Sequence, residues 1–230
     1  MIVKAVLCDL DGVLLDTFRS GLQKIHILCA MHEVPYGRET RTKLTNAWGM
    51  PAIELLTHCL GVNQSLAKEM NRVWETLDTS QRPQLIPGAR EVLLWLRHNK
   101  FKLALITSRH KKWLTELLDE IDLLNKFEVI TAKEDCPHHK PDPRVFRYAL
   151  ERLEELGIAK ENCIFVGDTP SDTQAGHAAG LETLVVQTGP YMIEHVNQYP
   201  IKLGNILRSI DDLPFWIEKN HEGVLDKIYL

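Results

Sequence analysis

The sequence has 230 residues, of which 44% are hydrophobic and 25% charged, and its formal net charge at pH 7 is −4. This length and composition are those of a globular protein with one domain and an insertion, and the mildly acidic balance favours neither nucleic acid nor a membrane as a partner. Five widely spaced cysteines without a C-x-x-C pair indicate neither a disulfide framework nor a thiolate zinc site, and charged residues interrupt every apolar run, so we expect a cytoplasmic protein.

Short apolar runs recur along the chain, and helical patterns separate them. The first run covers Val3 to Leu10 and is nearly continuous, as expected of a central strand that is buried on both faces. Similar runs occupy residues 102–107, 127–131, 163–167 and 182–187. The alternation of strands and helices predicts an α/β fold with a parallel sheet, and we expect the stretch beyond Gly189 to add short helices.

The segment between the first two strands has a different pattern. From about Phe18 to Arg82 the apolar residues repeat with a helical period, and no convincing β-branched run interrupts them. We therefore expect a small inserted helical unit over residues 17–84, and an α/β core domain made of residues 1–16 and 85–230. The expected helices of the inserted unit cover roughly residues 18–31, 38–48, 51–60 and 63–77.

Two carboxylates stand at the end of the first strand, where an open parallel sheet binds its ligands. Asp9 and Asp11 are two residues apart, so extended backbone would point both side chains the same way. Close carboxylates repel unless a cation compensates, which suits the division between a nucleophile and an acid/base. Gly12 lets the backbone turn and bring its amides close to a bound anion. These residues alone are equally compatible with an ordinary turn.

Two further polar segments follow the second and third strands. Thr107, Ser108 and Arg109 stand before a predicted helix, where hydroxyls and amides bind anions, although Thr-Ser is also an ordinary helix cap. Arg109 could contact a substrate or simply begin that helix. Lys140 precedes two prolines that restrict the backbone, so it could neutralise a phosphate, or it could be an exposed lysine in a loop.

The fourth strand ends next to Asp168 and Asp172, which lie four residues apart across a strand-to-helix junction. Magnesium prefers oxygen ligands and usually takes one or two carboxylates together with phosphate and water. Asp9, the carbonyl of Asp11 and Asp168 would supply such a set, while Asp172 could also stabilise the start of a helix. Because four successive strands deliver the groups that phosphoryl transfer needs to one edge, we favour the functional interpretation of all four segments.

These motifs resemble those of the haloacid dehalogenase superfamily, in order and across essentially the whole chain. The matching segments are Asp9-Leu10-Asp11-Gly12-Val13, Thr107-Ser108, Lys140-Pro141-Asp142-Pro143 and Gly167-Asp168-Thr169-Pro170-Ser171-Asp172. The resemblance implies a Rossmann-like core with helices on both faces of the sheet. It also implies that residues 17–84 correspond to the helical cap of the phosphoglycolate phosphatase and β-phosphoglucomutase branch.

The resemblance further implies a role for each matching residue. Asp9 corresponds to the nucleophile that forms an aspartyl-phosphate, and Asp11 to the acid that protonates the leaving alcohol and then activates water. Thr107 corresponds to the phosphate-binding hydroxyl and Lys140 to the phosphate-neutralising cation. Asp168 corresponds to a metal ligand, and Asp172 to a further ligand or an anchor behind the ligands.

The expected protein is a phosphatase that depends on Mg²⁺ and acts on a small phosphorylated metabolite. A β-phosphoglucomutase-like phosphomutase would use the same aspartates, and a phosphate-sensing or partner-binding protein without turnover is a further alternative. Asp11 argues against dehalogenases and phosphonate-cleaving relatives, which lack that aspartate. Trp48 could contribute to specificity or belong to the core of the helical unit. The sequence does not distinguish a monomer from a weak dimer.

Overall fold

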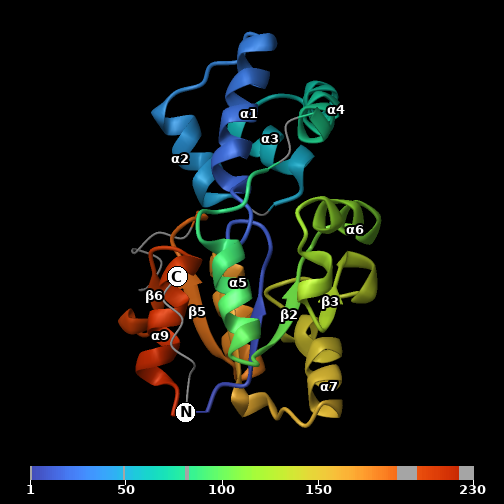
Figure 1. Ribbon diagram of the computed structural model, residues 1–230. Coiled ribbons are helices and arrows are strands. Elements are labelled where there is room, and N and C mark those ends of the chain that lie inside the picture. Colours follow the sequence, from blue (N-terminus) through green and yellow to red (C-terminus); the bar gives the residue numbers. More distant parts are fainter. Residues whose placement is uncertain (1, 49, 81–82, 191–200, 223–230) are drawn as a thin grey trace. The chain divides into compact units, whose positions relative to one another are not determined.

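The computed structural model describes residues 2–48, 50–80, 83–190 and 201–222 (Figure 1). The chain divides into two compact units. The larger unit consists of Met1–Leu14 and Leu85–Leu230, and the smaller unit of Leu15–Gln84. No helix in the described part of the chain is long and apolar enough to cross a membrane.

The larger unit contains a six-stranded parallel sheet with the strand order β3-β2-β1-β4-β5-β6. Its strands are β1 (Ala5–Cys8), β2 (Lys102–Ile106), β3 (Val129–Thr131), β4 (Cys163–Gly167), β5 (Glu182–Val186) and β6 (Ile206–Leu207). The chain builds outward from β1 to β3, then returns to the other side of β1 with β4. The strand order therefore reverses between β1 and β4, and ligands of such sheets bind at the carboxyl ends of the strands there.

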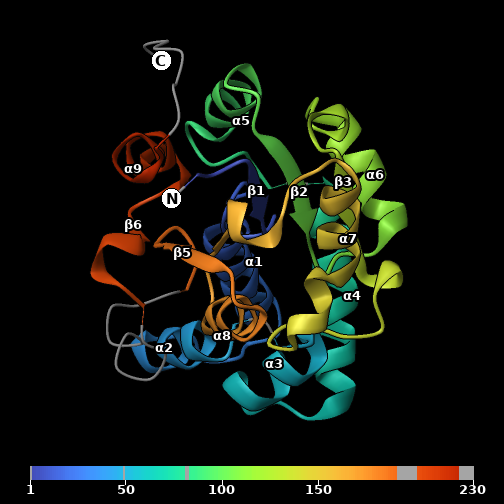
Figure 2. The same ribbon diagram turned by 90° about the horizontal axis from the view of Figure 1, so that it is seen from below.

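Helices cover both faces of this sheet. Figure 2 shows α5 (Ala89–His98) and α9 (Leu213–Asn220) on one face, and α7 (Arg147–Glu155) and α8 (Pro170–Ala179) on the other. Between β2 and β3 the chain forms α6 (Lys111–Glu120). Single-turn 3-10 helices are η1 (Leu124–Lys126), η2 (Lys133–Asp135), η3 (Pro143–Phe146), η4 (Lys160–Asn162), η6 (Leu203–Asn205) and η7 (Ile210–Asp212). The predicted α/β fold with helices on both faces is confirmed.

The core of the larger unit explains why the loops at the sheet edge are held in place. All four residues of β1 are buried, as the continuous apolar run predicts. On one side of the sheet, Phe146 of η3 packs edge-on against Phe165 of β4, with ring centroids 4.7 Å apart. Burial of each such side chain stabilises the fold by about 1.5–3 kcal/mol. This contact anchors η3, and with it the preceding loop that carries Lys140, to the strand that leads to Asp168.

The smaller unit is helical and consists of α1 (Thr17–Met31), α2 (Arg38–Asn46), α3 (Ala52–Leu60) and α4 (Gln64–Ser80). These bounds lie close to the four predicted helices. Trp48 packs against the core of this unit, with Phe18 edge-on at 5.1 Å between ring centroids and Trp74 at 6.4 Å. Gly21 makes room for the ring, because a Cβ there would lie 2.3 Å from Trp48 Cη2. Trp48 is thus a partly buried aromatic that packs against this core, while its neighbour Gly49 lies outside the described residues.

Candidate active site

A largely buried lysine links two segments that follow strands of the sheet. Lys140 Nζ lies 2.7 Å from Asp9 Oδ2 and 2.6 Å from Asp172 Oδ1. Asp9 is the first residue after β1, and its amide continues the pairing with β4 by donating to the carbonyl of Val166 at 2.9 Å. Its Oδ1 accepts from the amide of Leu10 at 2.7 Å. The backbone therefore fixes one oxygen of Asp9, and the lysine holds the other.

Asp172 occupies the first turn of α8 and also belongs to this cluster. Its Oδ2 accepts from the amides of Asp168 and Thr169 at 3.2 and 2.9 Å, while Thr169 Oγ1 caps the helix by accepting from the amide of Asp172. Because these capping contacts use Oδ2, the other oxygen of Asp172, Oδ1, contacts Lys140. The helix-start interpretation and the cluster interpretation of Asp172 are therefore compatible, as expected from the sequence.

Three buried carboxylates come together here, on Asp9, Asp168 and Asp172. One oxygen from each lies within 4.8 Å of the others. Lys140 supplies a single positive charge, which leaves two negative charges uncompensated when all four groups are ionised. Oδ1 of Asp168 is buried and has no hydrogen-bond partner among the described residues. The oxygen-only donor set, the excess negative charge and the unpartnered oxygen all fit a hard divalent cation such as Mg²⁺.

The pKa values of these groups reflect the crowding. Burial raises the pKa of Asp9 to about 7, with Lys140 opposing the shift and Asp172 and Asp11 adding to it. Burial also raises the pKa of Asp168, reinforced by the charges of Asp172 and Asp9. Burial acts to lower the pKa of Lys140, but the two carboxylates it contacts outweigh that effect and raise it. The lysine therefore stays charged, while protons compensate part of the carboxylate charge when no metal is bound.

Asp11 faces a different partner. Arg109 donates to it through both arms of the guanidinium, from Nε to Oδ2 and from Nη2 to Oδ1, each at 2.8 Å. The side chain of Arg109 thus reaches back to the β1 loop and does not merely begin α6, which starts at Lys111. Asp11 therefore does not belong to the cluster formed by Asp9, Asp168 and Asp172.

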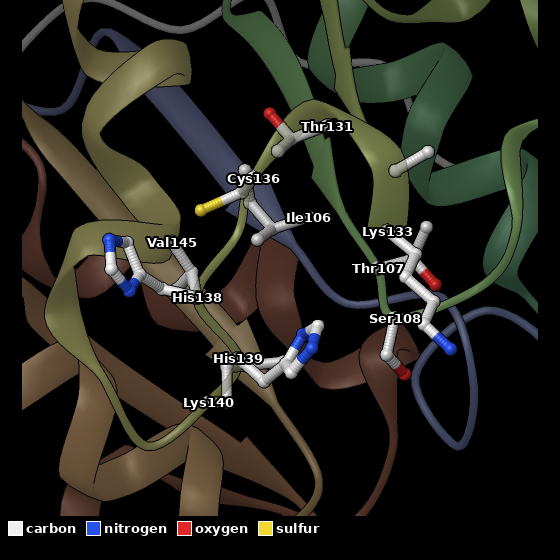
Figure 3. Close-up of a pocket in the computed structure, with 11 residues that line it drawn as sticks. Ile106, Thr107, Ser108, Thr131, Lys133, Cys136, His138, His139, Lys140 and Val145 are labelled. Carbon is white, nitrogen blue, oxygen red and sulfur yellow. The ribbon is translucent and has the colours of Figure 1, made fainter.

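Thr107, Ser108 and Lys140 line one pocket, shown in Figure 3. Thr107 is buried, and its Oγ1 accepts from the amide of Arg109 at 3.2 Å, whereas Ser108 is exposed. The amide of Thr107 donates to the carbonyl of Thr131 at 3.0 Å, so the end of β2 is fixed against β3. The other residues that line the pocket are Ile106, Thr131, Ala132, Lys133, Cys136, His138, His139 and Val145.

Gly12 allows the β1 loop to turn close to the carboxylates. It has φ = +76°, a left-handed conformation that side chains disfavour, and a Cβ there would lie 2.0 Å from Asp168 Oδ2. A second glycine, Gly189, approaches the same oxygen from the loop after β5. Thr188 and Gly189 in that loop were not among the predicted site residues. A signal existed, because Thr188 and Gly189 directly follow a predicted strand at the same edge of the sheet.

The stability of the metal-free protein is expected to fall as the pH rises from about 5 to about 7. The folded-state pKa of Asp9 lies above its usual value of 3.8, so in this window the folded chain holds a proton that the unfolded chain has released. Urea unfolding in EDTA at several pH values measures the effect. Asp9→Asn, which cannot titrate, should show a shallower pH dependence. An equal or steeper slope in that variant would contradict the assignment.

Comparisons with known proteins agree on one family. The family model of the haloacid dehalogenase-like hydrolases matches residues 6–186. A phosphorylated carbohydrates phosphatase of Thermotoga maritima is 28% identical over 184 residues, which cover 79% of this chain and 84% of that protein. A phosphoglycolate phosphatase of Pseudomonas savastanoi pv. phaseolicola is 28% identical over 217 residues, with 91% and 77% covered.

A solved structure shows the same fold. The chain superposes with a TM-score of 0.73 on a Thermotoga maritima protein assigned as a β-phosphoglucomutase. The two sequences are 23% identical, and the alignment covers 95% of this chain and all of that one. The arrangement of sheet and helices is therefore shared.

Proposed function

Because this chain belongs to the haloacid dehalogenase-like hydrolase family, we propose that it is a Mg²⁺-dependent phosphatase of a small phosphorylated metabolite. The observation that carries the proposal is the buried cluster of three carboxylates around one lysine. A divalent cation would balance the two negative charges that Lys140 leaves uncompensated, and the cation and Lys140 together would attract the anionic phosphate of a substrate. The relatives named as phosphatases of phosphoglycolate and of phosphorylated carbohydrates support the same reaction and indicate the substrate class.

Asp9 is assigned as the nucleophile of this reaction. Its Oδ1 is held by the amide of Leu10 and its Oδ2 by Lys140, so the carboxylate cannot rotate freely. Attack of Asp9 on phosphorus forms an aspartyl-phosphate and breaks the bond to the leaving alcohol. Lys140 stays positively charged beside this oxygen and offsets the charge of the incoming phosphate. A fixed nucleophile and a fixed cation remove much of the cost of reorganisation during the reaction.

Asp11 is assigned as the acid/base. It gives a proton to the leaving alcohol and then takes one from the water that attacks the phosphorus and regenerates Asp9. In the structure Arg109 occupies both carboxylate oxygens of Asp11. The acid step therefore requires Arg109 to release Asp11, and the phosphate of the substrate is a competing anion for its guanidinium.

The remaining residues would bind the phosphate and the metal. Thr107 and Ser108 offer hydroxyls in the pocket that Lys140 also lines, and the left-handed turn at Gly12 would bring its backbone amide to the phosphate. Asp9, Asp168 and Asp172 would hold the cation, together with the carbonyl of Asp11. When bound, Mg²⁺ supplies charge neutralisation at the phosphate oxygens. The assignment of residues 17–84 as a cap domain on a core of residues 1–16 and 85–230 is part of the same proposal.

Hydrolysis of an aryl phosphate is expected to require Mg²⁺ and to stop in EDTA, because the cluster keeps uncompensated charge without a cation. Restoring free Mg²⁺ should restore the rate. Phosphate release from p-nitrophenyl phosphate measures this, and a rate that is unchanged in EDTA would contradict the metal assignment.

A substrate panel separates the proposal from its alternatives. Phosphoglycolate and hexose phosphates should release inorganic phosphate in the presence of Mg²⁺. A phosphomutase would instead convert β-glucose 1-phosphate to glucose 6-phosphate without releasing phosphate in proportion. A phosphate-sensing protein would do neither, and would only bind phosphate.

A further inference from the structure

Two hydrogen bonds hold the loop that follows β5, one to strand β6 and one to the loop after β1. The amide of Gln187 donates to the carbonyl of Leu207 at 3.0 Å, which continues the pairing of β5 with β6. The hydroxyl of Thr188 donates to the carbonyl of Gly12 at 2.6 Å. A loop held on both sides in this way keeps the backbone of Gly189 at a fixed distance from the β1 loop.

Asp168 fills the space between these two loops. A Cβ on Gly189 would lie 1.8 Å from Asp168 Oδ2, and a Cβ on Gly12 would lie 2.0 Å from the same atom. Both values are far below any real contact between heavy atoms, so neither position accepts a side chain while Asp168 keeps its place. The carboxylate is 2% exposed and is confined between two stretches of backbone.

We propose that Thr188 and Gly189 are positioning residues for the metal-binding carboxylate of Asp168. The two glycines confine Oδ2 and so fix the rotamer of Asp168, which keeps its unpartnered Oδ1 available to a cation. The hydrogen bond from Thr188 to Gly12 keeps the loop after β5 close enough to the loop after β1 for the two glycines to enclose Oδ2 of Asp168. The inference rests on the proposed metal site, but it does not depend on the proposed reaction, because metal affinity is measured without a substrate.

Gly189→Ala is the sharpest test. Gly189 lies outside the left-handed region, so alanine adds a methyl group without backbone strain. The methyl would displace the Asp168 carboxylate, and supporting groups of this kind change metal affinity by about 10- to 100-fold. Isothermal titration of the full chain with Mg²⁺ should therefore show weaker binding by at least about tenfold. Gly204→Ala is the matched control, because a Cβ at Gly204 meets no atom within 4 Å.

A second pair of variants tests Thr188. Thr188→Val keeps the shape but removes the hydrogen bond to Gly12, and should weaken Mg²⁺ binding. Thr188→Ser keeps the hydroxyl and should retain the affinity of the unmodified chain. Wild-type Mg²⁺ affinity in Gly189→Ala, or equal affinities in the two Thr188 variants, would overturn the proposal.

The contact with Asp168 can also be tested in the metal-free protein. The three nearest atoms that a Cβ at Gly189 would meet are Oδ2, Cγ and Cβ of Asp168, all within 2.7 Å. In an Asp168→Gly background, which removes all three, the added methyl at position 189 should no longer lower the melting temperature. If Gly189→Ala alone does not fold, the double variant should still fold. A methyl that lowers the melting temperature equally in both backgrounds, or a double variant that does not fold, would show that Asp168 is not what the glycine accommodates.

Discussion

Asp9→Asn is expected to abolish turnover of aryl phosphates, with a loss of more than about 10⁴-fold in kcat. An amide is not a nucleophile toward phosphorus, and this one would lie where a carboxylate now accepts from the amide of Leu10 and pairs with the charge of Lys140. Removing the group that forms the covalent intermediate closes the two-step route altogether. Steady-state phosphate release with saturating Mg²⁺ measures the loss.

The control for this variant is an equivalent change far from the cluster. Asp122 has a largely exposed side chain that pairs with Arg90 and Lys126, so Asp122→Asn should leave kcat unchanged. Circular dichroism and a thermal melt should show that Asp9→Asn remains folded. A folded Asp9→Asn protein that retains kcat within about tenfold of the original would remove Asp9 from the role of nucleophile.

Lys140→Met is expected to cost about 3–5 kcal/mol of folding stability at neutral pH, in addition to most of the activity. Its ammonium contacts both Asp9 and Asp172, and only 12% of the lysine side chain is exposed. Methionine has a similar length and fills the same space, but it leaves the two carboxylates facing each other without a cation. Urea unfolding of the metal-free protein near pH 7 measures the cost.

Lys102→Met gives the matched comparison. Lys102 pairs with Glu128 at 2.8 Å, but both side chains are more than a third exposed, so the loss should be below about 1 kcal/mol. If the two variants are destabilised equally, the buried lysine does not compensate the carboxylate cluster. Excess Mg²⁺ should recover part of the stability lost in Lys140→Met, because it offsets the same charges.

The strands and the polar residues that follow them could be predicted from the sequence, because both obey the geometry of a parallel sheet. The apolar runs located five of the six strands in the described part of the chain, and the polar residues after four of them meet at one edge because parallel strands end together. Asp9, Lys140, Asp168 and Asp172 were selected on that basis, and the structure brings them together. Their chemical roles remain predictions until the variants are measured.

Other features depend on contacts that no local pattern encodes. Arg109 pairs with Asp11, which is 98 residues away in the sequence. No local pattern identifies one distant carboxylate as the partner of a long arginine side chain. The sequence left its partner open for this reason. β6 has only two residues, too few to show a period, so short helices were expected in that region. The helix α9 agrees with that expectation, whereas residues 191–200 and 223–230 lie outside the described part.

The most direct test is the mass of the protein during turnover. The chain is mixed with an aryl phosphate and Mg²⁺, quenched in acid and analysed intact and after proteolysis. The account predicts one added phosphoryl group on Asp9, absent from Asp9→Asn. That adduct should accumulate in Asp11→Asn, because a good leaving group needs no acid while hydrolysis of the intermediate still needs a base. Turnover without any phosphorylated protein, or with the phosphoryl group on another residue, would contradict it.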